Sequence, residues 1–595
     1  MFNYARDKAL LEDRSIYWRE TILSRSCLLM AAVICILILQ GATAINIHFS
    51  ASSGGQTVGV VDSYDIDDSV GVRGKASASF GGGVSIDESN SLWGSGSAII
   101  NQAFYGSGGG ADYVIYRALS TLDASKIAAS GSSSLTPTAG KVSSTLSTTG
   151  SLETASELWG VQGGDIAGVG SGAFLADIST SQSVATGGSV AASQKRSADG
   201  LMAWAYAEAV DANWNYAGTY AGMVDGNLAT VQGAQAGNSA TAGQTTEMEA
   251  EWGYAGSGAS DADGNYAGTY AGMVDGNLAT VQGAEAGNSA TAGQITEIEA
   301  EYGWASSYAW DADGNYAGTY AGMEDGNLAT VQGAQAGNSA TAGQITEIEA
   351  EWGYAGSWAF DADGNYAETY AGMVDGNLAT VQGAQAGNSA TAGQITEIEA
   401  EYGWAGSEAW DNDRNYAGTY AEIVDGTLFT LQGAEAEDGA RAAQLTFADA
   451  WWAEAGSYAE DDEGSYVNIY AEVLNGTLIT LQVVEAVNSA EGFQETEIKG
   501  DFAYAFCEAN NTVEGYYAYV DNYVVVDAYL AFRGEAAVDG DEAWAHQISY
   551  AEGLLIWPWA NSTTQGDERI EAGTFRSESF AWTNSTGEGA IITEL

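Results

Sequence analysis

A sequence unit of 50 residues recurs along the middle of the chain without insertion or deletion. The copies occupy 211–260, 261–310, 311–360, 361–410, 411–460 and 461–510, the last two in more divergent form. A fixed period of this kind is typical of architectures in which each unit stacks on the next. The length is close to that of a kelch repeat, but the paired glycines and the Tyr and Trp spacing of that repeat are missing. A propeller is therefore not favoured.

The unit at 261–310 predicts β-strands. Residues 266–273 alternate tiny and larger side chains, VDGN at 274–277 supplies an Asp-Gly turn, and 278–286 read as a second extended run. From Ser289 to Trp310 the pattern has a period of two, which indicates a strand with two different faces. Because that run is long for one strand, we expect a break or bend near Gly303, and hence three or four strands per repeat.

The fold class follows from the repeat and from the composition. Gly accounts for 78 residues, and Pro137 and Pro558 are the only prolines, so almost every backbone N–H is available to a ladder. A single unit buries too little apolar surface to fold alone. We therefore expect an all-β protein: an extended repetitive β-sheet or β-solenoid array of stacked, cross-β-like β-arches, in which residue i lies near residue i + 50.

Two aromatic residues exchange places at each step of the repeat. EWGYAGS at 251–257 returns as EYGWASS at 301–307, and the alternation continues at 351–357 and 401–407. If like positions meet between neighbouring units, each row alternates larger and smaller rings. Duplication of a 100-residue pair of units is the other interpretation. We expect these rings to belong to the core rather than to a carbohydrate-stacking surface: Trp252, Tyr254, Tyr302, Trp304, Trp352, Tyr354, Tyr402 and Trp404.

The repeats are strongly acidic. The formal net charge is −61, and no Lys or Arg occurs between Arg196 and Arg414. Carboxylates stacked at strand spacing would repel one another, so the rows must be spaced more widely, protonated, or bridged by a divalent cation. Calcium is the natural candidate for a cofactor, and DADGN resembles part of a calcium loop. The alternative is a polar hairpin turn beside a solvated acidic face. The possible ligands are Asp261, Asp263, Glu297, Glu299 and Glu301, with equivalents every 50 residues.

The residue types disfavour two classes of function. Binding to nucleic acid needs clustered cations, which this chain does not offer. His48 and His546 are the only histidines, and neither lies in a repeat. Carboxylate pairs alone could hydrolyse glycosides, but carboxylates copied every 50 residues suit a surface better than one active site. We therefore expect neither an enzyme nor a nucleic-acid partner.

The N-terminus predicts export. Basic residues precede the apolar run at 27–39, and GATA at 41–44 offers a cleavage site, so 1–44 are interpreted as a signal peptide. An uncleaved membrane anchor is the alternative, but the apolar run is shorter than the ~20 residues needed to span a bilayer. No second such run follows. We therefore expect a secreted protein at the cell surface, without a transmembrane segment after cleavage.

The flanks of the array are less regular. Residues 45–200 are rich in Gly, Ala and Ser and read as short strands with glycine turns, with disorder as the alternative around SSSLTPTAG at 132–140. Residues 201–510 hold the array. Residues 511–595 diverge, as expected of a cap. With Cys27 and Cys35 in the signal, Cys507 is the only mature thiol, either buried or bridging two chains. Four acceptor sites for N-glycosylation lie at or beyond the fading end of the array: Asn475, Asn510, Asn561 and Asn584.

The layout resembles a known family. An export signal, exact acidic repeats such as NYAGTYAGMVDGNLATVQGAQAGNSATAGQ at 215–244, and Asn-x-Ser/Thr sites are similar to the major sheath proteins of filamentous methanogenic archaea. The resemblance covers composition and layout over most of the mature chain, and it carries over no functional residue. It implies subunits that assemble with one another into amyloid-like, resistant tubes around cells.

We therefore expect a structural protein that self-assembles through β-sheet stacking into a sheath, wall or filament against the cell envelope. The alternative is a repetitive surface adhesin or S-layer-like protein, in which calcium rigidifies a β-solenoid and aromatic rows meet glycans or neighbouring cells. A self-assembling wall predicts polymers of the pure protein, whereas an adhesin predicts soluble rods with a partner.

Overall fold

The computed structural model describes strands and turns between residues 43 and 594. The segments it does not describe are 1–42, 54–55, 67–69, 81–83, 109–110, 137–140, 151–152, 163–164, 187–189, 238–239, 288–289, 337–339, 387–389, 437–438, 488, 511–516, 541, 553–554, 565–567, 576–581, 587–590 and 595. Side chains are described mainly from 156 to 510. Residues 1–42 of the predicted signal peptide lie outside the described residues, whereas Thr43 and Ala44, at its predicted cleavage site, begin β1.

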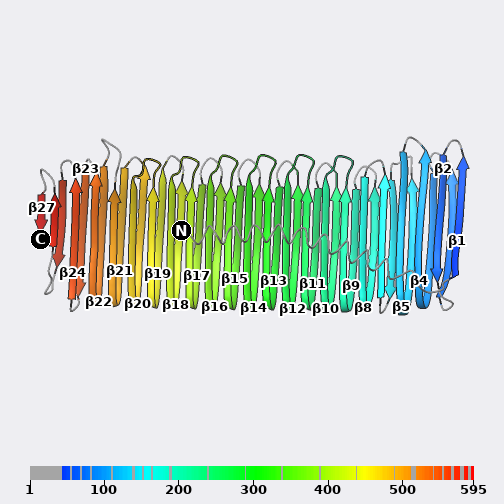
Figure 1. Cartoon of the computed structure of the whole chain (residues 1–595), viewed down its shortest axis with the longest axis horizontal. Coiled ribbons are helices and arrows are strands. Elements are labelled where there is room, and N and C mark those ends of the chain that lie inside the picture. The colour runs from blue at the N-terminus through cyan, green and yellow to red at the C-terminus, as the bar shows by residue number, and fades with distance from the viewer. Residues whose placement is uncertain are drawn as a thin grey trace.

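The described chain is all-β and forms one extended, open sheet, which confirms the expected fold class (Figure 1). The strands before the repeats are β1 (Thr43–Ser53), β2 (Gln56–Ile66), β3 (Val70–Phe80), β4 (Val84–Gly108), β5 (Ala111–Thr136), β6 (Lys141–Gly150), β7 (Glu153–Gln162), β8 (Asp165–Thr186) and β9 (Val190–Val210). Strands β1 and β27 lie at opposite ends of the array, so the sheet is not closed.

Each repeat contributes two strands rather than three or four. The strands of the array are β10 (Tyr216–Ala236), β11 (Ala240–Ser260), β12 (Tyr266–Ala286), β13 (Ala290–Trp310), β14 (Tyr316–Ala336), β15 (Ala340–Phe360), β16 (Tyr366–Ala386), β17 (Ala390–Trp410), β18 (Tyr416–Ala436), β19 (Ala440–Glu460), β20 (Tyr466–Val487) and β21 (Ser489–Asn510). All neighbours from β8 to β21 pair antiparallel. The predicted turn at 274–277 is therefore not a hairpin, because it lies inside β12.

That Asp-Gly pair instead bends the strand back on itself. Asp275 has a φ of 49°, in the left-handed region. A Cβ on Gly276 would lie 2.1 Å from the backbone oxygen of Glu299, so the close approach of two strands requires glycine. In the ladder Val274 pairs with Tyr302 and Gly276 with Ala300, while Asp275 and Glu301 are left out. The bend that the sequence predicts near Gly303 therefore lies at Glu301, two residues earlier.

The bend folds the whole sheet into two layers. Gln282 donates from Nε2 to the backbone oxygen of Ala255 at 3.2 Å, although Ala255 pairs with Ala271 in the other half of β12. The amide of Asn265, before β12, likewise donates to the backbone oxygen of Gly287, after it. Each strand is thus a β-arch with both ends at one edge, and the loops gather along that edge in Figure 1.

The core lies between the layers and contains a polar belt. One alanine-rich hydrophobic cluster, with Ala284 and Ala309, lies toward the loops, and a second, with Met273 and Leu278, lies toward the bend. Buried glutamines separate the two clusters and occupy one row on every strand from β8 to β21: Gln182, Gln194, Gln232, Gln244, Gln282, Gln294, Gln332, Gln344, Gln382, Gln394, Gln432, Gln444, Gln482 and Gln494. Such in-register amide ladders stabilise cross-β assemblies.

The glutamine ladder is directly hydrogen bonded. Gln344 donates to Oε1 of Gln382 at 2.9 Å, and Gln382 donates to Oε1 of Gln394 at 3.3 Å. A threonine row runs beside it, with the hydroxyls of Thr280 and Thr296 3.0 Å apart. A buried polar group that is left unpaired destabilises the folded state. A slip of one residue in the register would therefore be costly, because it would break the ladder. The ladder therefore specifies the register.

The pairing changes after the array. Strand β21 pairs in parallel with β22, and the later strands also pair in parallel. These strands are β22 (Tyr517–Gly540), β23 (Glu542–Glu552), β24 (Leu555–Thr564), β25 (Glu568–Phe575), β26 (Trp582–Thr586) and β27 (Ile591–Glu594). The divergent C-terminal region thus continues the same sheet with a different strand arrangement.

Candidate assembly surfaces

The two-layer array has three kinds of surface, named here from the repeat at 261–310. The aromatic face is the outer face of the layer built by residues 266–274 and 302–310. The glutamate face is the outer face of the other layer, built by residues 276–286 and 290–300. The bend edge joins the two layers at Asp275 and Glu301. No charged side chain occupies the core of this repeat.

The Trp and Tyr rings that exchange places lie on the aromatic face, not in the core between the layers. This corrects the expectation that they belong to the core. The side chains of Tyr302 and Trp352 are 41% and 38% exposed. The other members of the predicted set are half-buried on the same face: Trp252, Tyr254, Trp304, Tyr354, Tyr402 and Trp404. The inward positions change from even to odd residue numbers at the bend, so side chains that continue the even series beyond it point outward.

The exchanging Trp and Tyr rings share rows but do not lie on adjacent strands. Tyr254 and Trp304 both lie opposite Gly272, and Trp252 and Tyr302 both lie opposite Val274. Residue i and residue i + 50 therefore lie near each other in one row, as expected, but they do not lie directly opposite each other, because one strand separates them. The rings instead touch other aromatics, as in Tyr270 and Trp304, whose centroids are 6.3 Å apart.

Stacked rings also join neighbouring repeats nearer the loops. The rings of Tyr266 and Trp310 stack with centroids 4.3 Å apart, and Trp310 reaches Tyr316 of the next repeat at 6.4 Å. Burial raises the pKa of Tyr270 above its ordinary value, and burial together with the carboxylate of Glu422 raises the pKa of Tyr402 to about 12. The phenols of Tyr270 and Tyr402 therefore stay neutral over the physiological pH range.

The DADGN segment forms a structural turn. Both backbone N–H groups of Asp263 and Asn265 donate to Oδ1 of Asp261, at 3.0 and 2.9 Å, and the side-chain amide of Asn265 donates to Oδ2 at 2.7 Å. Oδ1 of Asn265 then accepts the N–H of Ala312 in the next repeat at 3.1 Å. The hydrogen bonds of this turn thus account for Asp261 without a metal ion.

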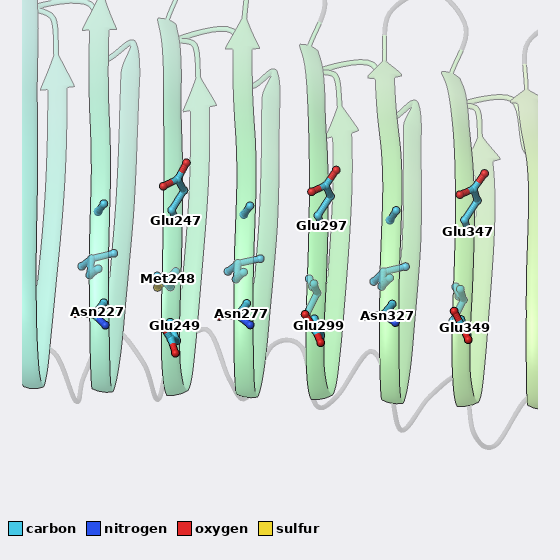
Figure 2. Close-up of a pocket in the computed structure, with 18 of the residues that line it drawn as sticks. Asn227, Glu247, Met248, Glu249, Asn277, Glu297, Glu299, Asn327, Glu347 and Glu349 are labelled. Atoms are coloured by element: carbon cyan, nitrogen blue, oxygen red, sulfur yellow. The ribbon is translucent and has the colours of Figure 1, made fainter.

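The carboxylates of Glu297 and Glu299 project from the glutamate face (Figure 2). On the flanking strands Glu297 pairs with Ala279 and Ala329, and Glu299 pairs with Asn277 and Asn327. Like charges therefore lie two strands apart, about 9.6 Å at the usual strand spacing. The strand order thus supplies the wider spacing, one of the three ways to relieve repulsion that the sequence allows.

The bend edge has no such spacing. A carboxylate occupies it on every strand from β10 to β18: Asp225, Glu251, Asp275, Glu301, Asp325, Glu351, Asp375, Glu401 and Asp425. Partial desolvation, with the nearby charges of Asp275, Asp325 and Glu324, raises the pKa of Glu301 above its ordinary value. Repulsion between carboxylates is therefore concentrated along this edge.

The structure does not bring the predicted calcium ligands together. Asp261 and Asp263 lie at the loop edge, whereas Glu301 lies at the bend edge, about 30 Å away for half of a 21-residue strand. Among the residues that the structure describes, no three acidic, histidine or cysteine side chains form a group that could hold a metal ion. The predicted ligand set is therefore not one site.

Two further predictions concern the C-terminal end. Asn475 is exposed at the bend of β20 and donates from Nδ2 to Oδ2 of Asp501 at 2.8 Å, and Asn510 ends β21. The side chains of Asn561 and Asn584 lie outside those described, on β24 and β26. Cys507 is fully buried in the core, which argues against a bridge between chains.

Sequence reasoning missed a row of exposed aliphatic side chains on the glutamate face. Val281 and Ile295 pair across β12 and β13 and are 53% and 54% exposed. The signal was present in QITEIEAE, where Ile295 is out of phase with the inward Ile298. A glycine row runs beside the aliphatic row, with Gly283 opposite Gly293.

Comparison with protein-family models, with curated proteins and with solved structures found no match to this chain. Within the described residues, no helix is long and apolar enough to cross a membrane. The function is therefore inferred from the surfaces of the array itself.

Proposed function

We propose that this protein is a structural, extracellular building block that assembles with copies of itself into a sheath, wall or filament around the cell. The observation that carries the proposal is the open sheet. Among the described strands, β1 pairs only with β2, and β27 pairs only with β25. An edge strand with unpaired backbone groups is a template for another strand.

The regularity of the array supports the same proposal. The register of each strand with its neighbours repeats in every copy, so the two faces continue without steps over β10 to β21. The glutamine ladder and the absence of proline from the array are features of durable cross-β assemblies. A protein with one binding or catalytic site would not need the same surface in each repeat.

The experiment has two parts. Antibodies against the array, detected by immunogold labelling on intact cells, are expected to mark the outer surface, and the purified protein is expected to form polymers visible by electron microscopy. A protein that stays inside the cell, or that remains monodisperse at millimolar concentration, would contradict the proposal.

A second candidate is a surface adhesin, and one observation favours it. The aromatic rows face outward, where rings such as Tyr302 and Trp352 could stack on sugar rings. In that role calcium would bridge carboxylates and rigidify the array. Binding of the purified rod to a glycan array, lost on chelation of calcium, would favour the adhesin over the self-assembling wall.

A further inference from the structure

An aliphatic ridge crosses the glutamate face. It consists of one outward side chain on each strand from β12 to β20: Val281, Ile295, Val331, Ile345, Val381, Ile395, Leu431, Leu445 and Leu481. Their exposed fractions run from 54% at Ile295 to 37% at Leu481. A continuous exposed apolar row of this length is typical of an interaction surface rather than of free surface.

A glycine groove lies directly beside the ridge on its loop side. It consists of Gly233, Gly243, Gly283, Gly293, Gly333, Gly343, Gly383, Gly393 and Gly433, on consecutive strands from β10 to β18. A Cβ on Gly283 would meet its nearest atom, the backbone oxygen of Ala242, at 4.0 Å, and one on Gly293 would meet that of Gln332 at 3.7 Å. These are ordinary contacts, so the single chain leaves room for larger residues here.

Other glycines of the array differ in this respect. A Cβ on Gly272 would lie 2.3 Å from the ring of Trp304, and one on Gly276 would lie 2.1 Å from a backbone oxygen. Glycine inside a strand weakens it and often marks the close approach of another backbone. The groove therefore needs an explanation outside the single chain.

We infer that a second copy of this chain packs on the glutamate face, with the ridge of each copy seated in the glycine groove of the other. The symmetry is a two-fold axis parallel to the long axis of the array, midway between the ridge and the groove. This rotation reverses the order of the rows. The ridge of the first copy therefore meets the groove of the second, and the groove of the first meets the ridge of the second, in one self-complementary interface. The inference rests on the proposed self-assembly and specifies one surface through which it occurs.

The charges favour this arrangement over the alternative. On the bend side of the ridge lies the row of Glu297 and Ala279, and on the loop side of the groove lies a row that holds mainly Thr and Gln, such as Thr291 and Gln335. Ridge in groove places each glutamate row opposite the Thr and Gln row of the second copy, which supplies hydrogen-bond donors. Ridge on ridge about a two-fold axis parallel to the strands would keep the order of the rows and place the glutamate rows against each other.

The area is sufficient for a specific interface. Ridge and groove overlap on the seven strands β12 to β18, about 34 Å at the usual strand spacing. The four side-chain rows from the glutamate row to the Thr and Gln row span three row spacings, about 20 Å, in the other direction. The resulting area of roughly 700 Å² per copy approaches the ~800 Å² per partner of a standard specific interface.

The test compares three triple variants of the full protein on the same strands, β12, β16 and β18. The ridge variant carries Val281→Thr, Val381→Thr and Leu431→Thr, and the groove variant carries Gly283→Thr, Gly383→Thr and Gly433→Thr. The control carries Val274→Thr, Val374→Thr and Val424→Thr on the aromatic face. Threonine suits strands, and the groove positions have room for it, so each variant is expected to fold.

Cryo-electron microscopy of edge-on particles gives the readout. One two-layer array is about 20 Å thick and a face-to-face pair about 40 Å, from sheet spacings near 10 Å. We expect the ~40 Å thickness in the wild type and the control, and the ~20 Å thickness in the ridge and groove variants. Circular dichroism checks that all four proteins keep their strand content.

Three results would overturn the inference: pairs that persist in both variants, loss of pairs in the control as well, or a wild type of single thickness. Polymers that still grow end to end at single thickness would refute this interface but leave the proposed self-assembly standing. Absence of any polymer in the wild type would instead contradict the proposed function.

Discussion

A Cβ atom on Gly272 would lie 2.3 Å from the indole ring of Trp304 on the neighbouring strand. The ring thus occupies the space above a glycine, and Tyr254 flanks the same glycine from the other side. The glycine rows of the aromatic face are therefore part of the packing of the rings.

This relationship predicts unequal effects of two alanine substitutions on β12. Gly272→Ala should lower the free energy of unfolding by about 1–3 kcal/mol, because the ring of Trp304 must move. The new Cβ of Gly283→Ala makes only an ordinary contact, 4.0 Å from the backbone oxygen of Ala242, and should change the free energy of unfolding by less than about 0.5 kcal/mol. Guanidinium unfolding followed by tryptophan fluorescence measures both. Equal losses would contradict the seating of the ring on Gly272.

The glutamine ladder predicts a similar contrast on β16. Gln382→Asn shortens the side chain and breaks contacts with Gln344, Gln394 and the backbone oxygen of Ala355, so buried amide groups lose their partners. We expect a loss of about 1–3 kcal/mol in the free energy of unfolding. Gln385→Asn, at an exposed position of the same strand, is the control and should be neutral. If the ladder did not stabilise the fold, both variants would leave the free energy of unfolding unchanged.

The conformation of the bend predicts which residues can replace Asp275. Its φ of 49° suits Asn but is strained for a β-branched residue, so Asp275→Val should cost about 1–2 kcal/mol relative to Asp275→Asn. Both variants remove the same charge, so charge repulsion at the bend edge does not enter their difference. Thermal unfolding by circular dichroism measures it, and equal midpoints would argue against a left-handed residue at the bend.

The bend edge predicts a pH dependence of stability. The pKa of Glu301 is raised in the folded protein, so between the ordinary carboxyl pKa of about 4.3 and the raised value the folded state binds more protons than the unfolded state. Stability therefore falls as pH rises through this window and increases on acidification toward its lower end.

Unfolding midpoints measured from pH 7 to pH 4.5 test this sign, with Glu301→Gln as the comparison. The variant should show a shallower dependence than the wild type, because it lacks the group with the raised pKa. A wild type that loses stability on acidification, or an unchanged slope in the variant, would show that repulsion at the bend edge does not matter.

The sequence predicted the fold class and the repeat, because period-two alternation and exact duplication are local signals. It did not predict that 274–277 bend a strand rather than end it. An Asp-Gly pair serves either purpose, and only the strand pairing on both sides of Asp275, Val274 with Tyr302 and Gly276 with Ala300, distinguishes the two. The error about the aromatic residues follows directly. Once the inward positions change from even to odd numbers at the bend, Trp304 points outward rather than into the core.

The candidate site was predicted less well for a related reason. The spacing of the glutamate side chains depends on the strand that lies between two glutamate-bearing strands. Strand β12, which carries Asn277 and Ala279, separates the glutamates of β11 from those of β13. The loop motif DADGN resembled a metal site because Asp and Asn occur both in metal sites and in turns. The sequence does not show which hydrogen bonds these side chains make. The exposed Ile295 was visible in the sequence as a residue out of phase.

Fibre diffraction from oriented assemblies of the purified protein tests the central claim most directly. The account predicts a strong meridional reflection near 4.8 Å, an equatorial one near 10 Å, and weaker meridional orders near 9.6 and 19 Å from the two-strand repeat and the Trp–Tyr alternation over two repeats. A pattern without the 4.8 Å meridional reflection, or a protein that forms no orientable assembly, would contradict it.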